Sequence, residues 1–350
     1  AGITTAAIAV GGQTYSPAAK VAIAETWNGT TWTETGDLNQ LRRNLPVCGT
    51  TTAAFAGNGG PSAGALVAAE SFDGSSWTEL TENNTGREMP SISCNSPNTS
   101  LIMFGGKPPA VIAKTEHYDG TSWTEVADLA NARTEAGGTG TLSAALSFGG
   151  DPNPIRDYTE EFTAPATFRQ FDVGDIYYNA DPSSGVLKYV GYAAGTWASS
   201  NNMNTARAGM ASFGTQTAAL GAGGADPYPG YVETYDGSSW TEVADLNNAR
   251  GWFAGAGTTT AGLVAAGYDG SRDGETETWN GSGWTEVADQ NTGRYKVGIS
   301  KLGTTTATII FGGEGPSADE DTTEEYNGTS WTEVADLNTA RTIHGGGTGT

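Results

Sequence analysis

Short apolar runs separated by turn residues recur along this chain, and their spacing predicts strands rather than helices. Near the end of each unit an aromatic residue is followed by Asn-Gly or Asp-Gly, two small residues and then Trp. The clear copies end at Trp32, Trp77, Trp123, Trp240, Trp284 and Trp331, and an eroded copy runs from Phe162 to Trp197. Consecutive tryptophans lie 45, 46, 74, 43, 44 and 47 residues apart. The chain is therefore an internal repeat with one long insertion.

Each repeat predicts four short strands. The Asn-Gly or Asp-Gly pair predicts a hairpin with a type I′ turn, in which both central residues take positive φ. It joins a third strand, such as residues 233–235, to a fourth, such as residues 240–244. A polar connector of the Asp-Leu-Asn-x-Ala-Arg kind follows, then a strand rich in Gly and Thr, and then an apolar strand. Four strands in about 45 residues are typical of one propeller blade.

Glycine doublets end the apolar strands. They are Gly11–Gly12, Gly59–Gly60, Gly105–Gly106, Gly149–Gly150, Gly223–Gly224 and Gly312–Gly313, and the sixth blade has Ala266-Gly267 instead. A doublet, then an aromatic residue, then Trp resembles the kelch repeat, and the resemblance covers the chain apart from the insertion. It implies an all-β, seven-bladed β-propeller of four-stranded antiparallel blades that forms a single domain over residues 1–350.

The two ends of the chain predict how the ring closes. Residues 1–41 begin at the second strand of a blade, and residues 342–350 read as a first strand with no sequel. We expect the C-terminal strand to pair into this N-terminal blade, with blades 2–7 formed by residues from about 42 to 341. Closure of this kind leaves no open sheet edge.

Charged and aromatic residues recur with the same period. The arginines are Arg43, Arg87, Arg133, Arg207, Arg250, Arg294 and Arg341, and the glutamates are Glu25, Glu70, Glu116, Glu160 or Glu161, Glu233, Glu277, and Glu324 or Glu325. A catalytic group normally occurs once, so this recurrence favours structural ion pairs or Arg-to-carbonyl bonds. The repeat tryptophans, including Trp197, are expected to pack between blades. A ring of sugar-stacking aromatics is the alternative.

Composition and charge restrict the classes of partner that this chain is expected to bind. The chain has 51 glycines and a net charge of −22, with 17 Lys and Arg against 39 Asp and Glu. This balance argues against nucleic acid and anionic membranes as partners, and no apolar run is long enough to span a bilayer. Cys48 and Cys94 are expected to be free, buried thiols at equivalent positions of neighbouring blades.

No cofactor is expected from the sequence. His117 and His344 are the only histidines, which disfavours a multi-histidine metal centre and the copper site of galactose oxidase, an enzyme that shares the kelch fold. Two acidic loops offer weak candidates for Ca²⁺, namely Asp269 and Asp273 in one loop and Asp319 and Asp321 in the other. Neither loop has EF-hand spacing, so solvated acidic loops are the favoured interpretation.

The insertion in blade four, residues 163–192, is the individual feature of the chain. Residues 174–189 predict a hairpin. The candidate binding residues are Arg169, Tyr177, Tyr178, Lys188, Tyr189 and Tyr192. Exposed tyrosines with a few cations are typical of recognition surfaces, whereas the alternative is a hairpin packed on a blade flank. This hairpin, like the W-T-E-V-A-D-L-N-T-A-R repeats, resembles segments of structural proteins of marine tailed bacteriophages.

These observations favour a non-enzymatic binding or structural propeller, virion-associated or extracellular, that presents loops to a protein or glycan partner. The phage resemblance implies the virion location. The alternative is a kelch-type carbohydrate-active enzyme, an epimerase, lyase or hydrolase. Such an enzyme needs non-periodic acids, bases and a cation that converge on one face of the ring.

One prediction separates recognition from stability. Replacing the insertion by a short Gly-Ser linker should leave the melting temperature unchanged, because the repeats supply all seven blades without it. Binding to the protein or glycan partner should weaken, since loops on a rigid scaffold usually carry recognition. Unfolding of the variant, with undiminished binding by its folded fraction, would contradict this assignment.

Overall fold

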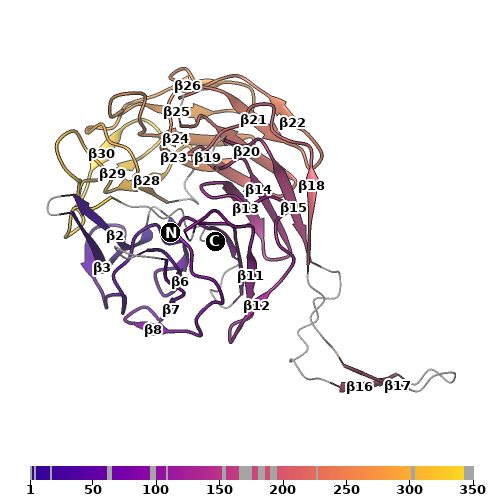
Figure 1. Ribbon diagram of the computed structural model, residues 1–350. Helices are drawn as coiled ribbons and strands as arrows, with labels where there is room; N and C mark the ends of the chain where they lie inside the picture. The colour runs from indigo at the N-terminus through magenta and orange to yellow at the C-terminus, as the bar shows by residue number, and fades with distance from the viewer. Residues whose placement is uncertain are drawn as a thin grey trace.

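Seven four-stranded antiparallel sheets stand around a central axis in the computed structural model (Figure 1). The structure describes residues 2–3, 5–15, 18–60, 65–94, 100–107, 109–151, 155–164, 176–179, 186–189, 195–225, 228–300 and 304–342. Over these residues the regular elements are all strands. None of the described segments is a helix long and apolar enough to cross a bilayer. The fold is the all-β seven-bladed propeller that the repeat predicts.

Each blade takes its four strands in chain order, with the first strand nearest the axis and the fourth at the rim, as β23 and β26 show in Figure 1. Blade 1 holds β1 (Gly2–Ile3), β2 (Ala6–Tyr15), β3 (Ala18–Trp27) and β4 (Trp32–Glu34). Blade 2 holds β5 (Val47–Thr50), β6 (Ala53–Gly57), β7 (Ala69–Phe72) and β8 (Trp77–Glu79). Blade 3 holds β9 (Ser91–Cys94), β10 (Leu101–Phe104), β11 (Thr115–Tyr118) and β12 (Trp123–Glu125).

Blade 4 holds β13 (Gly137–Thr141), β14 (Ala144–Phe148), β15 (Thr159–Thr163) and β18 (Thr196–Ser200). Blade 5 holds β19 (Ala211–Thr215), β20 (Ala218–Ala222), β21 (Val232–Tyr235) and β22 (Trp240–Glu242). Blade 6 holds β23 (Ala254–Thr258), β24 (Ala261–Ala265), β25 (Thr276–Trp279) and β26 (Trp284–Glu286). Blade 7 holds β27 (Gly298–Ile299), β28 (Thr308–Phe311), β29 (Thr323–Tyr326) and β30 (Trp331–Glu333).

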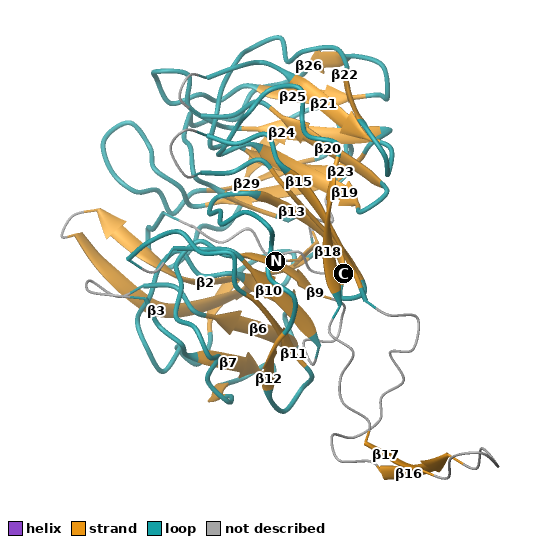
Figure 2. Ribbon diagram, turned by 45° about the vertical axis from the view of Figure 1, so that its right-hand side comes forward, coloured by secondary structure: helices purple, strands orange, loops and turns teal. Residues whose placement is uncertain are grey.

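The insertion forms a separate two-stranded sheet, β16 (Ile176–Asn179) and β17 (Val186–Tyr189). Both views show it outside the ring, beyond β18 (Figures 1 and 2). Its expected start at residue 163 is too early, because Thr163 pairs with Thr196 and Ala164 is buried in the blade. A linker that replaces the insertion should therefore begin after Ala164.

The Asx-Gly hairpins form, but the predicted type I′ turn is wrong. Tyr235 pairs with Trp240, so the loop between β21 and β22 has four residues, and only Gly237 takes positive φ. The Asp236 carboxylate accepts the backbone N–H groups of Ser238 and Ser239, each at 2.8 Å. A side chain thus supplies the hydrogen bonds of the turn. These bonds lower the pKa of Asp236 to about 2.

In blade 2 the predicted doublet is one residue late. Strand pairing places Asn58 and Gly59, rather than Gly59–Gly60, where other blades have two glycines. The first position takes φ of 52° at Asn58 and 67° at Ala266, so it tolerates other residues. The second is glycine in every blade. A Cβ on Gly59 would lie 2.6 Å from the Arg43 carbonyl oxygen, which only glycine avoids.

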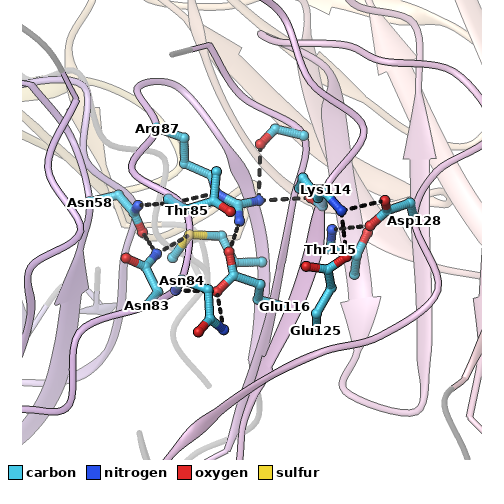
Figure 3. Close-up of polar contacts among 12 residues, drawn as sticks. Asn58, Asn83, Asn84, Thr85, Arg87, Lys114, Thr115, Glu116, Glu125 and Asp128 are labelled. Carbon is cyan, nitrogen blue, oxygen red and sulfur yellow. Dashed lines mark hydrogen bonds and ion pairs between the residues drawn. The ribbon is translucent and has the colours of Figure 1, made fainter.

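Each blade junction is fastened by a connector arginine that bonds to both neighbouring blades, as Arg87 does. Figure 3 shows the bonds of its guanidinium to blade 3. The carbonyl oxygen of Arg87 accepts the Gly59 N–H of blade 2 at 2.9 Å. Its guanidinium pairs with Glu116 of blade 3 and donates to the Lys114 carbonyl at 2.7 Å. The other Glu116 oxygen accepts the backbone N–H of Asn84 at 2.7 Å. Burial lowers the pKa of Arg87, and Glu116 opposes that shift.

The same pairing recurs at all seven junctions. The pairs are Arg42–Glu70, Arg87–Glu116, Arg133–Glu160, Arg207–Glu233, Arg250–Glu277, Arg294–Glu324 and Arg341–Glu25. Arg43 is therefore the wrong choice for the first junction. The ring position lies ten residues after each repeat tryptophan, which is Arg42, whereas Arg43 donates to Gln13. Glu160 and Glu324, not Glu161 and Glu325, are the paired carboxylates.

The last blade meets the first through the same contacts. Arg341 pairs with Glu25, and its carbonyl oxygen accepts the Gly313 N–H at 3.0 Å. Thr342 forms a bridge with Gln13. The expected strand of residues 343–350 lies outside the described residues. The prediction that the chain begins at a second strand is wrong, because Gly2 and Ile3 form β1 and pair with β2.

The repeat tryptophans pack between blades, and at four of them a threonine of the preceding blade accepts the indole N–H. Trp331 Nε1 donates to Thr276 Oγ1 of the preceding blade at 2.9 Å. Thr115, Thr159 and Thr323 do the same for Trp197, Trp240 and Trp32. Where that position is Ala24 or Val232, the buried Nε1 atoms of Trp77 and Trp284 have no partner in the described structure. Trp123, which follows the blade with Ala69 at that position, donates instead to the Thr81 carbonyl at 3.0 Å. Six of the seven are buried and Trp197 is half-buried, so the ring of sugar-stacking tryptophans is not formed.

Cys48 is buried in β5. The expected equivalence of the two cysteines is wrong. Cys48 pairs with Phe55, whereas the matching position of blade 3 is Ser93, which pairs with Ile102. Cys94 is one residue further along its strand, and the alternation of a strand places the two residues on opposite faces of their blades. The side chain of Cys94 lies outside the described part.

The junction predicts a large effect of breaking one buried pair. Arg250→Ala should lower the free energy of unfolding by about 3–5 kcal/mol, because it leaves the Glu277 carboxylate buried without its charge partner. Denaturant unfolding measures this loss. Arg156→Ala is the control, since Arg156 forms no ion pair with any described residue. Equal stability of the two variants would show that the junction does not depend on the pair.

The tryptophan pattern predicts a second, smaller effect. Thr276→Val should cost about 1–3 kcal/mol of unfolding free energy, because Trp331 Nε1 would lose its acceptor in a buried site. The reciprocal Val232→Thr offers Trp284 an acceptor and should cost less. Denaturant melts of both variants test the pattern, and a greater loss at Val232→Thr would contradict it.

Candidate functional site

Two residues after each junction arginine, the backbone takes the left-handed conformation. The described positions are Asn44, Met89, Glu135, Gly209, Trp252 and Lys296, with φ between 50° and 61°. Residues other than glycine rarely adopt this conformation, and clusters of such residues are typical of functional sites. The six positions share one backbone geometry, yet all six residues differ in type.

Neighbouring blades hold this conformation in place. Met89 N–H donates to the Asn44 carbonyl at 3.0 Å, Trp252 N–H to the Gly209 carbonyl at 3.0 Å, and Lys296 N–H to the Trp252 carbonyl at 3.1 Å. These bonds run from blade junction to blade junction around the axis. The surrounding structure therefore fixes the strained backbone and leaves the side chain at each position free to vary.

The six residues line one cavity of about 460 Å³ at the ring axis. Its other walls come from the innermost strands, through residues such as Ser91, Gly138 and Ser212. Prolines and methionines, among them Pro46 and Met210, add apolar surface. A cavity of this size with a few polar groups in apolar walls is typical of a small-molecule site.

Among the described residues that line the cavity, two carry charges, and the charges are of opposite sign. Glu135 is exposed to solvent within it and forms no hydrogen bond or ion pair with a described residue. Partial desolvation by the walls raises the pKa of Glu135, and repulsion from Asp151 raises it further. Lys107 and Lys296 act in the opposite direction.

Lys296 belongs to a patch of aromatic and charged residues beside the cavity. Its ammonium lies 4.8 Å from the Tyr295 ring centroid and 3.8 Å from the Glu314 carboxylate. Arg272 also pairs with Glu314, at 2.9 Å. Burial and a hydrogen bond with Glu314 raise the pKa of Tyr295.

Trp252 anchors the aromatic part of this patch. Its ring centroid lies 5.8 Å from Tyr228 and 6.3 Å from both Tyr268 and Tyr295. The indole also packs on Gly209, where a Cβ would lie 2.9 Å from Trp252 Nε1. The glycine in one blade thus makes room for the tryptophan of the next.

The candidate recognition residues from the sequence lie elsewhere. Tyr177, Tyr178, Lys188 and Tyr189 belong to β16 and β17, where Tyr177 pairs with Lys188. Their side chains, and all of Arg169 and Tyr192, lie outside the described residues. The cavity residues were missed because they form no motif. The available signal was divergence within near-identical repeats, at a fixed distance after the arginine.

The four candidate calcium ligands hold loops in place through hydrogen bonds. Asp269 accepts the Ser271 N–H at 2.9 Å, and Asp273 accepts the Glu275 N–H at 2.9 Å and the Asn248 amide at 2.8 Å. Asp319 accepts from the Thr342 hydroxyl at 2.7 Å, and the carbonyl of Asp321 accepts the Leu337 N–H. No three His, Cys, Asp or Glu side chains of the described segments group as metal ligands.

Among solved structures, the chain is similar to the structure of YjhT, with a TM-score of 0.55 and 14% sequence identity. The match covers 84% of this chain and 97% of that chain. At this identity the likeness shows the propeller fold alone. No protein-family model and no curated protein matches the sequence.

Proposed function

We propose that this propeller is a binding protein, not an enzyme, and that its ligand enters the axial cavity. The observation that carries this proposal is the contrast between backbone and side chain at one repeat position. The junctions keep the left-handed backbone at all six described sites, whereas the side chains change from Asn to Met, Glu, Gly, Trp and Lys. On a chain that repeats Trp-Thr-Glu almost unchanged, such variation is expected where each blade contributes a separate contact.

Charge placement supports the same site. Seven of the 17 Lys and Arg residues are used in the buried junction pairs. Of the remaining ten, Lys296 lines the cavity, and Lys107 acts on the cavity residue Glu135. Cations are scarce on this acidic chain, so one that lines the cavity and a second that acts on Glu135 favour a recognition role there.

A carbohydrate-active enzyme is the second candidate, and one observation favours it. Glu135 has a raised pKa beside a second carboxylate, Asp151, an arrangement that can separate a general acid from a base. Glycosidase, lyase and epimerase assays on oligosaccharides test this alternative. If the protein turns over an oligosaccharide and Glu135→Gln abolishes that turnover, a carbohydrate-active enzyme replaces the binding protein as the proposed function.

The kelch-type assignment and a virion or extracellular location belong to the proposal as well. They rest on the glycine doublets, the W-T-E-V-A-D-L-N-T-A-R repeats and the residue 174–189 hairpin, which resemble kelch and phage structural proteins. A protein or glycan partner would then present a small protruding group to the cavity. Tail or capsid genes beside the gene for this chain would support the virion location.

Filling the cavity should abolish binding without unfolding the ring. Ser212 lines the cavity from β19 and is half-buried, so Ser212→Trp places an indole in the ligand space. Thr241→Trp, on the exposed face of β22, is the matched control. A glycan array and a panel of short peptides, read by binding and by thermal shift, should lose their hits in the first variant only. Hits that survive Ser212→Trp would place recognition elsewhere.

A further inference from the structure

The two charged side chains of the axial cavity lie on opposite sides of the axis. Glu135 belongs to the third junction and Lys296 to the sixth of a seven-membered ring. They form no ion pair with each other, although Lys296 is near enough to lower the pKa of Glu135. The space between a carboxylate and an ammonium that do not meet is suited to a ligand that carries both charges.

Each group remains able to bind such a ligand. Glu135 is exposed in the cavity and no described residue bonds to it. Lys296 is held at the wall by the rings of Tyr295 and Trp252, at 4.8 and 5.9 Å from its ammonium, and by Glu314. An ammonium has three donors, and a single carboxylate at 3.8 Å does not use all of them.

Apolar and hydroxyl-bearing side chains line the same cavity as the two charges. Met89 and Met210 are among them, and methionine adapts to side chains of different shape. Ser91 and Ser212 supply hydroxyl groups to the same walls. A neutral sugar offers hydroxyl groups but no counter-charge to Glu135 and Lys296, so a ligand that carries both charges matches this pair better.

We propose that the axial cavity binds a short zwitterionic peptide, with its terminal ammonium on Glu135 and its terminal carboxylate on Lys296. A free amino acid holds its two charges close together, whereas a short peptide carries them at its two ends, which suits groups on opposite sides of the axis. Two or three residues separate the charges and place apolar side chains against the methionines. This inference rests on the proposed function and names the ligand class of the same site.

The test pairs each terminus of the peptide with its side chain. The probe is the tripeptide Ala-Leu-Ala, with its N-acetylated and C-amidated forms, measured by calorimetry on the full chain. Glu135→Gln and N-acetylation should each weaken binding about tenfold or more, and together no further, because both remove the same charged contact. Lys296→Met and C-amidation should behave in the same way. Met is tolerated at this backbone position, since Met89 occupies its equivalent.

Glu242→Gln, an exposed carboxylate of β22, is the control and should leave affinity unchanged. The proposal is overturned if Glu135→Gln does not weaken peptide binding, or weakens it no more than Glu242→Gln does. If the protein binds uncharged oligosaccharides but not the peptide, and Ser212→Trp abolishes that binding, the peptide is the wrong ligand class. The proposal that the axial cavity binds a ligand would still hold. Absence of any binding that depends on the cavity would overturn both.

Discussion

The ring depends on the buried arginine that joins one blade to the next. Its main chain receives a hydrogen bond from the blade behind and its guanidinium pairs with a glutamate of the blade ahead, as Arg250 does with Gly224 and Glu277. A buried ion pair contributes little net stability compared with apolar groups of the same volume, but breaking it is costly. Its main consequence is therefore geometric. Because the pair tolerates little displacement, each blade is set at a fixed position and angle relative to its neighbour.

The sequence predicts the repeated features well, because a feature that recurs in seven copies stands out from substitutions that occur in only one copy. The four strands, the ring and most of the Arg–Glu pairs follow from the period alone. It fails where one copy deviates. Arg42 and Arg43 are adjacent and chemically identical, and only the ten-residue spacing from Trp32 separates them. A match to pairs of glycines predicts Gly59–Gly60 as the doublet of blade 2, whereas Asn58 also takes the left-handed conformation.

The cavity could not be predicted from residue types, because its residues have none in common. Glu135, Trp252 and Lys296 are far apart in the chain and line one cavity only because the blades form a ring. The property that they share is a left-handed backbone conformation, and among residue types only glycine indicates that conformation in a sequence. Conversely, the tyrosines of the insertion were predicted as a recognition surface from residue type alone, although β16 and β17 stand apart from the ring.

Rigidity at the junction and diversity at the cavity have a common origin. The residue that lines the cavity follows the junction arginine by two positions, and the residue between them forms a β-bridge with a residue of the next blade, as Tyr295 does with Glu314. Substitution at the lining position thus leaves the arginine, its glutamate and the bridge unchanged. The left-handed backbone costs about 1–3 kcal/mol at a residue other than glycine, and the paired connector on either side supports that strain. A repeat of this kind can change its ligand one blade at a time without changing its fold.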